Sequence, residues 1–343
     1  MAQFDPVPGD KTVMFDKGIG RLLVPLGGSA QIQLWGGAKQ GSDAWPLIVD
    51  VNDPNVAMVS PVRSNLASWT FVYRIDGVNK GNAMLEARDF GPVCPTEAFQ
   101  RAQWLSRPVY AFVQLTVVPE YLQSQGQWGS KPYKSTNPMW HNVQWTNMAQ
   151  AGCGPTSLAI IMDYITTWDS RYARPQNACI APNVTPSQTM EFTSKYGRAA
   201  DKNNKPSGTD GVTMMRNLGV WWPGYASEML GIGKGGVDAA ENALKRGEVL
   251  LFLINNGNTF TFDKSGNLKE QHWGGHFMVL IGVDSAASGA HQTFFIADPS
   301  LAQTRFVTRN TLESKCKIWR VYRDPLFSNQ SASSPPNMAF PNP

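Results

Sequence analysis

The pattern of hydrophobic residues changes in kind halfway along this chain of 343 residues. Up to about residue 120 the apolar residues form short runs rich in β-branched and aromatic side chains, separated by Gly, Pro, Asn and Asp. Beyond residue 139 a helical spacing comes first, and apolar runs follow it. Because a domain takes roughly 150 residues, this change predicts two domains with different folds.

The first half contains seven runs with the length and composition of β-strands. They are RLLVPLGG, AQIQLWGG, PLIVDV, VAMVSPV, WTFVYRI, NAMLEAR and VYAFVQLTVV. Several alternate polar and apolar residues with period two, as in QIQLW at 31–35. Short strands at near-regular spacing predict an all-β sandwich, here over residues 1–122. The segment 123–138 is polar and broken by Gly and Pro, which predicts a linker.

The second half begins with a helical pattern and continues with strands. Apolar residues recur at helical spacing in Leu158, Ile161, Met162 and Ile165. The stretch VDAAENALKRG predicts another helix with Gly247 just beyond its end. Four strands are predicted from EVLLFLIN, HFMVLIGVD, QTFFIADP and KIWRVYRD. Helices followed by a sheet indicate an α+β domain, here over 139–326, and the polar, Pro-rich end predicts a disordered tail over 327–343.

Composition and charge exclude several classes of protein. Lys and Arg number 30 and Asp and Glu 26, so the net charge is only +4 and does not indicate a nucleic-acid partner. No apolar run approaches the ~20 residues of a membrane-spanning helix, so membrane insertion is not expected. The first residues lack the basic and apolar regions of a secretory signal. We therefore expect synthesis in the cytoplasm without a cleaved signal peptide.

The segment QAGCGPTSLAIIMDYI places Cys153 just before a predicted helix with Pro155 in its first turn. Unpaired N–H groups and the positive end of a helix dipole stabilise a thiolate and lower the pKa of the thiol. Gly152 and Gly154 leave room for a substrate backbone to approach the sulfur. Cys153 is therefore a candidate nucleophile, with a buried structural cysteine as the alternative.

Two further residues complete a candidate constellation with this cysteine. His276 begins a strongly apolar strand directly after two glycines, where an imidazole can face a cleft and take a proton from a thiol. Asp298 ends the next predicted strand, in FFIADPS. Neighbouring antiparallel strands would bring Asp298 near His276, where a carboxylate can orient the imidazole. Taken singly, each residue has a plain structural alternative, a core histidine and a turn aspartate.

Metal and cofactor sites are not expected. His272 and His276 have an HxxxH spacing, but two glycines lie between them and the glutamate of a zinc-peptidase helix is missing. The four cysteines lie far apart without a CxxC pair, so neither a zinc site nor a disulfide framework is indicated. GIGKGG at 231–236 matches GxGxxG, but it reads as a Gly-rich loop before a helix, because no strong strand is predicted before it.

The motifs AGCGPTSLAIIMDY, GGHFMVLIGVD and FFIADPS resemble papain-like cysteine peptidases, in particular the bacterial branch with the bacteriocin-leader (double-glycine) peptidases. The resemblance covers residues 139–323. It implies a papain-like fold with Cys153 as nucleophile, His276 as base and Asp298 as orienting residue. The stretches VNDPNVAMVSP and DGVNKGNAMLEAR resemble bacterial immunoglobulin-like domains, which implies an immunoglobulin-like sandwich in the first half.

The resemblance also implies a side-chain amide that stabilises the oxyanion, together with the backbone N–H of Cys153. Three amides compete. Gln144, nine residues before the cysteine, lies in HNVQWTN, which is similar to the family's Gln-aromatic-x-Asn motif. Asn147 is six residues before the cysteine and Gln150 three. We select Gln144 because of its motif, although its spacing from Cys153 is unusual for the family.

The leading hypothesis is a cysteine peptidase that cleaves peptide bonds through a thioester acyl-enzyme. Hydrolysis of a peptidoglycan stem peptide, or acyl transfer, is a second hypothesis with the same residues, and a non-catalytic binding or adhesion protein is a third. Immunoglobulin-like modules of this kind work outside the cytoplasm, which favours a bacterial effector toxin exported by a signal-independent secretion system. The partners expected are a protein or peptide substrate and an immunity or chaperone protein.

Overall fold

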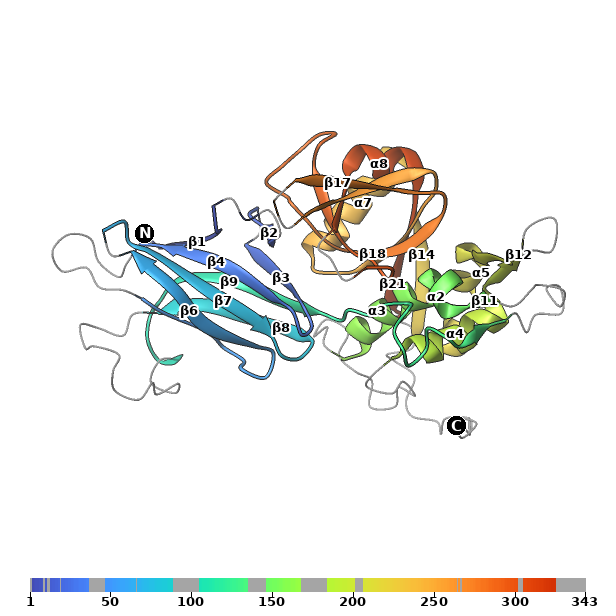
Figure 1. The fold of residues 1–343 in the computed structure, drawn as a ribbon, viewed down its shortest axis with the longest axis horizontal. Helices are drawn as coiled ribbons and strands as arrows, with labels where there is room; N and C mark the ends of the chain where they lie inside the picture. The colour runs from blue at the N-terminus through green and yellow to red at the C-terminus, as the bar shows by residue number, and fades with distance from the viewer. Residues whose placement is uncertain are drawn as a thin grey trace.

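The computed structural model describes residues 2–8, 10, 13–18, 20–36, 47–65, 67–88, 105–134, 146–167, 184–200, 206–263, 265, 267–301 and 305–324. Gln144, Cys94, Cys179 and the predicted tail over 327–343 lie outside these ranges. Figure 1 shows two parts side by side, a β-rich part at the N-terminal end and a part of strands and helices beyond it. We call them the sandwich (residues 2–118) and the C-terminal part (residues 121–324).

The sandwich consists of two β-sheets that share one core. The first sheet has the order β1-β4-β7-β6, with strands β1 (Gln3–Pro6), β4 (Ser29–Trp35), β6 (Ala57–Asn65) and β7 (Thr70–Gly77). The second has the order β2-β3-β9-β8-β5, with strands β2 (Met14–Asp16), β3 (Arg21–Pro25), β5 (Ile48–Val51), β8 (Gly81–Arg88) and β9 (Val109–Val118). All seven predicted strands are present, and β1 and β2 are added.

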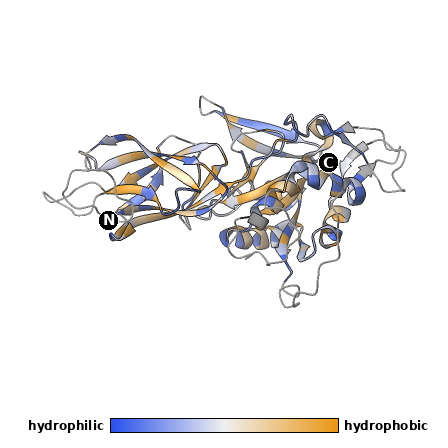
Figure 2. Ribbon diagram, turned by 90° about the horizontal axis from the view of Figure 1, so that it is seen from below, coloured by the Kyte–Doolittle hydropathy of each residue, from blue (hydrophilic) through white to orange (hydrophobic). Residues whose placement is uncertain are grey.

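The core of the sandwich forms because its strands alternate. Ile32, Leu34 and Ile75 from the first sheet meet Leu22 and Leu85 from the second, and all five are completely buried. Figure 2 shows hydrophobic residues along these strands. β3 pairs with β9 in parallel, whereas the other strand pairs of the two sheets are antiparallel.

The C-terminal part is built on an eight-stranded antiparallel sheet of order β14-β21-β15-β18-β19-β20-β16-β17. Its strands are β14 (Tyr225–Gly231), β15 (Leu250–Ile254), β16 (Gly257–Phe262), β17 (Leu268–Trp273), β18 (His276–Val283), β19 (Thr293–Ala297), β20 (Arg305–Thr308) and β21 (Cys316–Arg323). The four predicted strands form its centre. Every residue of β18 is buried, since helices cover both of its faces.

Short elements and helices complete this part. They are β10 (Pro132–Tyr133), β11 (Thr146–Asn147), α2 (Met148–Ala151), α3 (Cys153–Thr167), α4 (Pro186–Tyr196), β12 (Arg198–Ala200), β13 (Pro206–Thr209), α5 (Gly211–Arg216), α6 (Leu218–Trp221), α7 (Gly233–Lys245) and α8 (Arg309–Lys315). α7 ends as predicted, with Gly247 at φ +84° just beyond its cap residue Arg246. The predicted Gly-rich loop at 231–236 is wrong, because β14 ends at Gly231 and α7 begins at Gly233.

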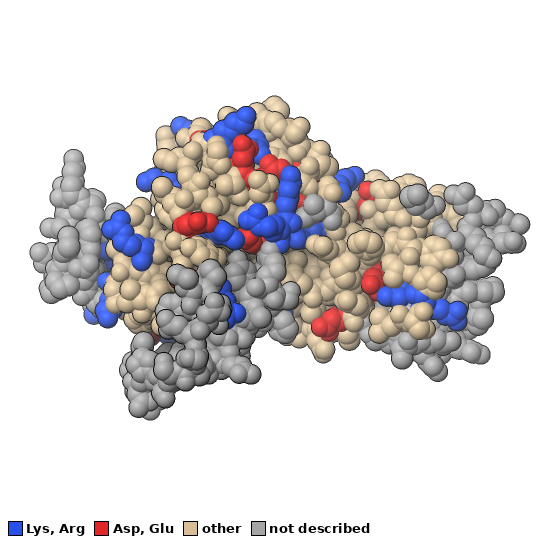
Figure 3. Space-filling view, turned by 180° about the vertical axis from the view of Figure 1, so that it is seen from behind, with Lys and Arg blue, Asp and Glu red and all other residues tan. Residues whose placement is uncertain are grey.

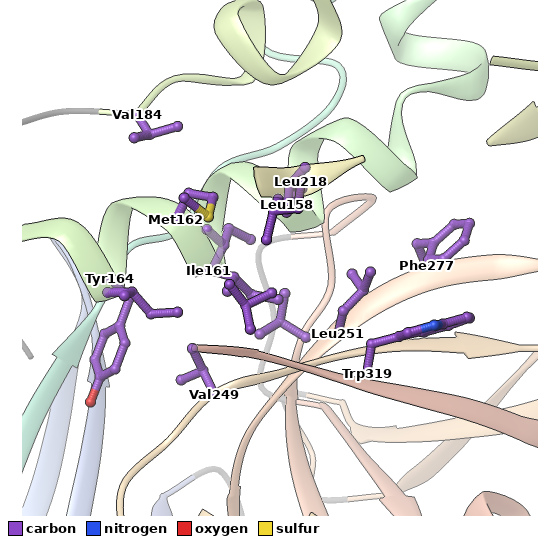
Figure 4. Packing of buried hydrophobic residues seen from close by; sticks show 14 of the residues in the cluster. Leu158, Ile161, Met162, Tyr164, Val184, Leu218, Val249, Leu251, Phe277 and Trp319 are labelled. Carbon is purple, nitrogen blue, oxygen red and sulfur yellow. The ribbon is translucent and has the colours of Figure 1, made fainter. Parts of the chain in front are cut away.

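Helices α3 and α7 cover opposite faces of the sheet. Figure 4 shows the α3 side, where Leu158 and Ile161 pack over Leu251. On the other face, α7 packs against Leu250, Phe252 and neighbouring residues. α8 is tied to α7 by ion pairs of Arg309 with Asp238 and Glu241. Figure 3 shows charged side chains of both signs beside one another on this part of the surface.

Helix α3 differs from the amphipathic helix that its sequence predicts. Leu158, Ile161, Met162 and Ile165 are buried as expected, but Asp163 on the other side is buried too, with 0% of its side chain exposed. Lys80 of the sandwich lies 2.5 Å from Asp163, and the Tyr121 hydroxyl donates to the same carboxylate at 2.7 Å. The polar side of α3 therefore faces another part of the protein instead of water.

Apolar and polar contacts join the sandwich to the C-terminal part. Leu22 faces the sandwich core, and its neighbour Leu23 packs into the core of α3 and the second sheet. Gly282 makes room for Leu23, because a Cβ at Gly282 would lie 2.5 Å from a Leu23 methyl carbon. Arg21 Nη1 donates to the Leu244 carbonyl at 2.9 Å, and the Ser285 hydroxyl donates to Asp16 at 2.6 Å. These contacts bury both faces of β3.

The segment 123–138, predicted as a linker, is described up to residue 134. Trp128 and Tyr133 in it are buried and pack against Met148. Gln123 N–H donates to the Pro299 carbonyl at 2.7 Å. This stretch is thus part of the packed structure, next to the residue that follows Asp298.

We expect Lys80→Met to lower the free energy of unfolding of the full chain by about 3–5 kcal/mol, because it leaves the buried Asp163 carboxylate without its cation. Lys17→Met is the matched control: Lys17 is 56% exposed and lies 3.5 Å from Asp5, so its loss should cost less than about 1 kcal/mol. Urea unfolding of both variants measures the two values. Equal losses would show that the contact between Lys80 and Asp163 is not an energetically coupled buried pair.

Candidate functional site

Cys153 is the first residue of helix α3, directly after the short helix α2 and Gly152. Pro155 is therefore the third residue of the helix. Its missing N–H costs nothing there, because the N–H groups of the first turn have no partner within the helix. The Cys153 side chain is partly exposed, and Cys153 is one of two described cysteines, both with free thiols.

Glycines on both sides of Cys153 are required by close contacts. A Cβ at Gly152 would lie 2.4 Å from the Met148 carbonyl oxygen, and a Cβ at Gly154 would lie 2.5 Å from Thr209 Oγ1. The turn into α3 can therefore form only with small residues at these two positions. This packing fixes the direction in which the Cys153 thiol enters the site.

His276 and Asp298 lie together as the predicted strand order requires. His276 begins β18, Asp298 follows β19, and these two strands are neighbours in the sheet. His276 Nε2 lies 2.8 Å from Asp298 Oδ1, and both side chains are buried. Cys153 and His276 interact, since each shifts the pKa of the other. Because Nε2 faces Asp298, Nδ1 is the ring nitrogen left for the thiol.

Asp298 Oδ1 is held by further donors. Ser300 donates to this oxygen from its backbone N–H at 2.8 Å and from its hydroxyl at 2.7 Å. Arg305 Nε of β20 lies 3.3 Å from the other oxygen, Oδ2. Ser300 could have been predicted from the sequence, since a serine two residues after an aspartate often closes an Asx turn. Arg305 carries no such signal, because its position depends on the pairing of β20 with β19.

The ring of His276 is also fixed from its face. The Trp273 indole stacks on it with the ring centroids 4.0 Å apart and an angle of 15° between the planes. Trp273 Nε1–H donates to Thr259 Oγ1 at 2.9 Å. His272, the alternative histidine of the HxxxH spacing, is exposed on β17 and contacts Asn258. The structure thus brings His276, not His272, to Cys153.

The charges of these groups depend on one another. Burial alone would raise the pKa of the Cys153 thiol, but the hydrogen bond and charge of His276 outweigh it and lower that pKa. Burial would lower the pKa of His276, but Asp298 and Cys153 raise it to about 9. Burial opposes ionisation of Asp298, yet His276 and Ser300 hold its pKa below the usual value. These shifts favour the thiolate, the imidazolium and the carboxylate over their neutral forms.

A buried cluster lies behind the sulfur. The Tyr133 hydroxyl is 2.9 Å from Thr209 Oγ1, and Thr209 packs on Gly154. The Arg198 guanidinium lies 4.5 Å from the centre of the Tyr133 ring, and its Nε donates to the Tyr133 carbonyl. This cluster supports the turn at Cys153 from three separate segments. Nothing in the sequence around Arg198 signals this role.

The three candidate oxyanion amides differ in what the structure shows. Gln144 lies outside the described residues. Asn147 is the cap residue of α2, and its side-chain oxygen accepts from the Gln150 N–H at 3.0 Å. Gln150 is exposed. Asn147 therefore caps helix α2, and it is also one of the residues that the sequence allows as the oxyanion donor.

The described ranges show neither a metal site nor a membrane-spanning helix. No group of three His, Cys, Asp or Glu residues there could hold a metal ion. None of the helices in the described ranges is both long and apolar enough to cross a membrane. A cavity of about 230 Å³ lies between the sandwich and the sheet, with Leu23, Glu120 and Ala297 among its lining. It lies beside the strand that leads to Asp298 and does not include Cys153.

The fold and the site define a sheet-rich protein with a cysteine beside a histidine and an aspartate, the set of groups used for nucleophilic chemistry by cysteine enzymes. The profile of the Peptidase_C39-like family matches residues 137–325. This match covers more than half of the sequence, and the chain belongs to the Peptidase_C39-like family. It is thus a peptidase by family.

Comparison with solved structures gives only distant matches. Domains 4 and 5 of the S-layer protein SbsC align with 16% identity over 31% of this chain and 44% of that one, at a TM-score of 0.21. Domains 4–9 of the same protein align with 12% identity over 89% of this chain and 31% of that one, at a TM-score of 0.20. This chain therefore covers less than half of either matched structure. TM-scores this low establish no shared fold. No curated protein matches the chain.

We expect iodoacetamide at pH 7 to alkylate Cys153 at least about tenfold faster than Cys316, because the thiolate is the reactive form. Burial raises the pKa of Cys316 to about 12. His276→Ala should move the midpoint of Cys153 alkylation upward, toward about pH 8.5, since the imidazolium is what lowers the pKa of that thiol.

Peptide mapping by mass spectrometry over a pH series measures both effects. His272→Ala is the matched control, because it removes an exposed imidazole, and it should leave the midpoint unchanged. If the midpoint is the same in His276→Ala and in the unsubstituted protein, His276 does not lower the pKa of the Cys153 thiol, and the assignment is contradicted.

Proposed function

We propose that this protein is a cysteine peptidase in which Cys153 is the nucleophile, His276 the general acid and base, and Asp298 the residue that orients His276. The observation that carries the proposal is the position of the Cys153 thiol at the start of α3 against His276, whose Nε2 is held 2.8 Å from Asp298 Oδ1. Family membership supports it independently.

The reaction would proceed in two steps. The Cys153 thiolate attacks the carbonyl carbon of the scissile peptide bond, and the resulting tetrahedral intermediate collapses as His276 Nδ1 gives its proton to the leaving amine. This leaves a thioester between Cys153 and the acyl part of the substrate. Neutral His276 then takes a proton from water, the hydroxide adds to the thioester, and the carboxylic acid leaves with the thiol restored.

Asp298 contributes by holding the imidazole in one tautomer and by stabilising its charged form. The donors on Oδ1 fix the carboxylate, so that the His276 ring cannot turn without breaking a buried hydrogen bond. The Trp273 ring, which stacks on the face of the imidazole, also restricts the tilt of the His276 ring. A fixed ring keeps Nδ1 at the sulfur throughout both steps, which is the benefit of orientation in catalysis.

Gln144 is proposed as the side chain that stabilises the oxyanion, together with the N–H of Cys153. Its motif supports this choice, and the structure adds that Asn147 is engaged as a helix cap and that Gln150 is exposed. An amide that already accepts a backbone N–H is less free to turn toward a developing oxyanion. Gln144 therefore remains the proposed donor.

The sandwich is proposed to be an immunoglobulin-like module that presents or spaces the peptidase. Support comes from its two sheets around one core and from the parallel pairing of β3 with β9. Its close contacts with α3 favour a fixed arrangement over a flexible tether. The double-glycine branch, export by a signal-independent route, the role of an effector toxin and an immunity or chaperone partner stay predictions.

Incubating the purified protein with a bacterial proteome and mapping new N-termini should reveal cleavage that Cys153→Ala abolishes. Triad members act as a unit, so His276→Ala should lose nearly as much, at least about 10³-fold in kcat. His272→Ala should retain full activity. The alkaline limb of kcat/KM should fall near pH 9, where the leaving amine loses its proton donor. Full activity in Cys153→Ala would end the proposal.

Gln144→Ala should lower kcat by roughly 10²–10³-fold and change KM little, because an oxyanion donor acts in the transition state. Cys153 alkylation should stay normal in this variant, which separates the oxyanion role from a damaged fold. Asn147→Asp keeps an acceptor for the Gln150 N–H and removes the amide donor, so it should be much milder. A larger loss in Asn147→Asp than in Gln144→Ala would assign the oxyanion to Asn147.

A further inference from the structure

A buried cation stands behind the catalytic carboxylate. Asp298 Oδ1 accepts from His276 and Ser300, whereas Oδ2 accepts no hydrogen bond from the described residues. Arg305 Nε lies 3.3 Å from Oδ2. The side chains of Asp298 and Arg305 are 0% and 3% exposed. A full positive charge therefore lies on the side of Asp298 opposite the imidazole, in a place that water does not reach.

The position of Arg305 is fixed by the sheet. In β20, Arg305 pairs with Ile296 of β19 on one side and with Thr261 of β16 on the other. Its Nη1 donates to Thr259 Oγ1 at 3.3 Å. The same hydroxyl accepts from Trp273 Nε1–H at 2.9 Å. Arg305 is thus held in place by β20 and Thr259, with its Nε 3.3 Å from Oδ2 but without a hydrogen bond to it.

These contacts close a ring of neighbours around the imidazole. His276 contacts Asp298 through Nε2, Asp298 faces Arg305, and Arg305 and Trp273 share the Thr259 hydroxyl. Trp273 then stacks on the face of His276. Both constraints on the imidazole, its hydrogen bond and its stacked face, therefore depend on the same edge of the sheet.

We propose that Arg305 is a positioning residue that sets the proton affinity of His276 by holding Asp298 and by opposing its negative charge, which goes beyond the proposed triad and rests on it. The cation keeps Asp298 ionised and takes up part of its negative charge. The carboxylate then stabilises the imidazolium less than it would alone. His276 gives up its proton to the leaving amine more readily for that reason, and still holds it long enough to pair with the thiolate.

Other charged groups near the imidazole are few in the described ranges. Cys153 of α3 faces Nδ1, and Asp298 faces Nε2. Arg305 of β20 pairs with Asp298, and Arg198 of β12 and Tyr133 of β10 act on Cys153 from behind. Among the described residues, Arg305 is the arginine or lysine that pairs with Asp298, so its removal should change the proton affinity of His276 in one direction.

The test is the pKa of His276, measured by NMR on protein with ¹³C-labelled histidine and assigned with His276→Ala. Arg305→Gln should raise the pKa of His276 by roughly one unit, as loss of a neighbouring cation does. Arg305→Lys keeps the charge and should shift it much less. Arg246→Gln is the matched control, because it removes an arginine that pairs with Glu248 instead of Asp298, and it should leave the pKa of His276 unchanged.

A second pair of variants covers the case in which Arg305→Gln does not fold. Asp298→Asn leaves Arg305 facing the site without its counter-ion, whereas Asp298→Asn with Arg305→Gln removes both charges of the buried pair, which is better tolerated than removing one. The pKa of His276 should be higher in the double variant than in Asp298→Asn alone. Equal values in these two proteins would overturn the proposal, as would equal shifts in Arg305→Gln and Arg305→Lys.

The readout does not require hydrolysis of any substrate. If the protein cleaves no peptide but His276 shifts as expected, the proposed function fails and the assignment of Arg305 stands. If it cleaves peptides through Cys153 but the pKa of His276 does not change with the charge at position 305, the proposed peptidase function stands. In that case Arg305 is only a structural residue of β20.

Discussion

The burial of helix α3 on every side is the constraint on which the rest of the structure depends. One side packs on β15 and β18 through Leu158 and Ile161, and the other meets α4 and the sandwich. Because the helix begins at Cys153, its packing against β18 also fixes the distance between the thiol and His276, the first residue of that strand. The same apolar contacts that stabilise the fold therefore assemble the site.

The buried charge on α3 explains why two parts with different folds behave as one structure. Asp163 on the sandwich side of α3 has lost its water, and Lys80 and the Tyr121 hydroxyl replace it. Such a carboxylate is tolerated only while its partners stay in place. The sandwich thus supplies a charge that helix α3 needs, in addition to the apolar surface of Leu23 and Val118.

The site itself is a row of four groups that ionise with alternating sign. Cys153, His276, Asp298 and Arg305 follow one another, and the first three shift one another's pKa toward the charged form. In a buried site each charge is stabilised chiefly by its neighbours, so the pKa of any one depends on all the others. Trp273 stacks on the His276 imidazole and restricts its movement away from Cys153 and Asp298.

The sequence by itself determined the features that are local. Period-two runs predicted the strands of the sandwich, helical spacing and Pro155 predicted a helix just after Cys153, and the succession of two apolar strands placed Asp298 beside His276. Tertiary structure alone decided the rest: the parallel pairing of β3 with β9, the burial of Asp163, and the positions of Arg198 and Arg305. Each of these depends on contacts between segments far apart in the chain. Periodicity reports how a residue lies within its own helix or strand, and it carries no information about which distant strand will become its neighbour.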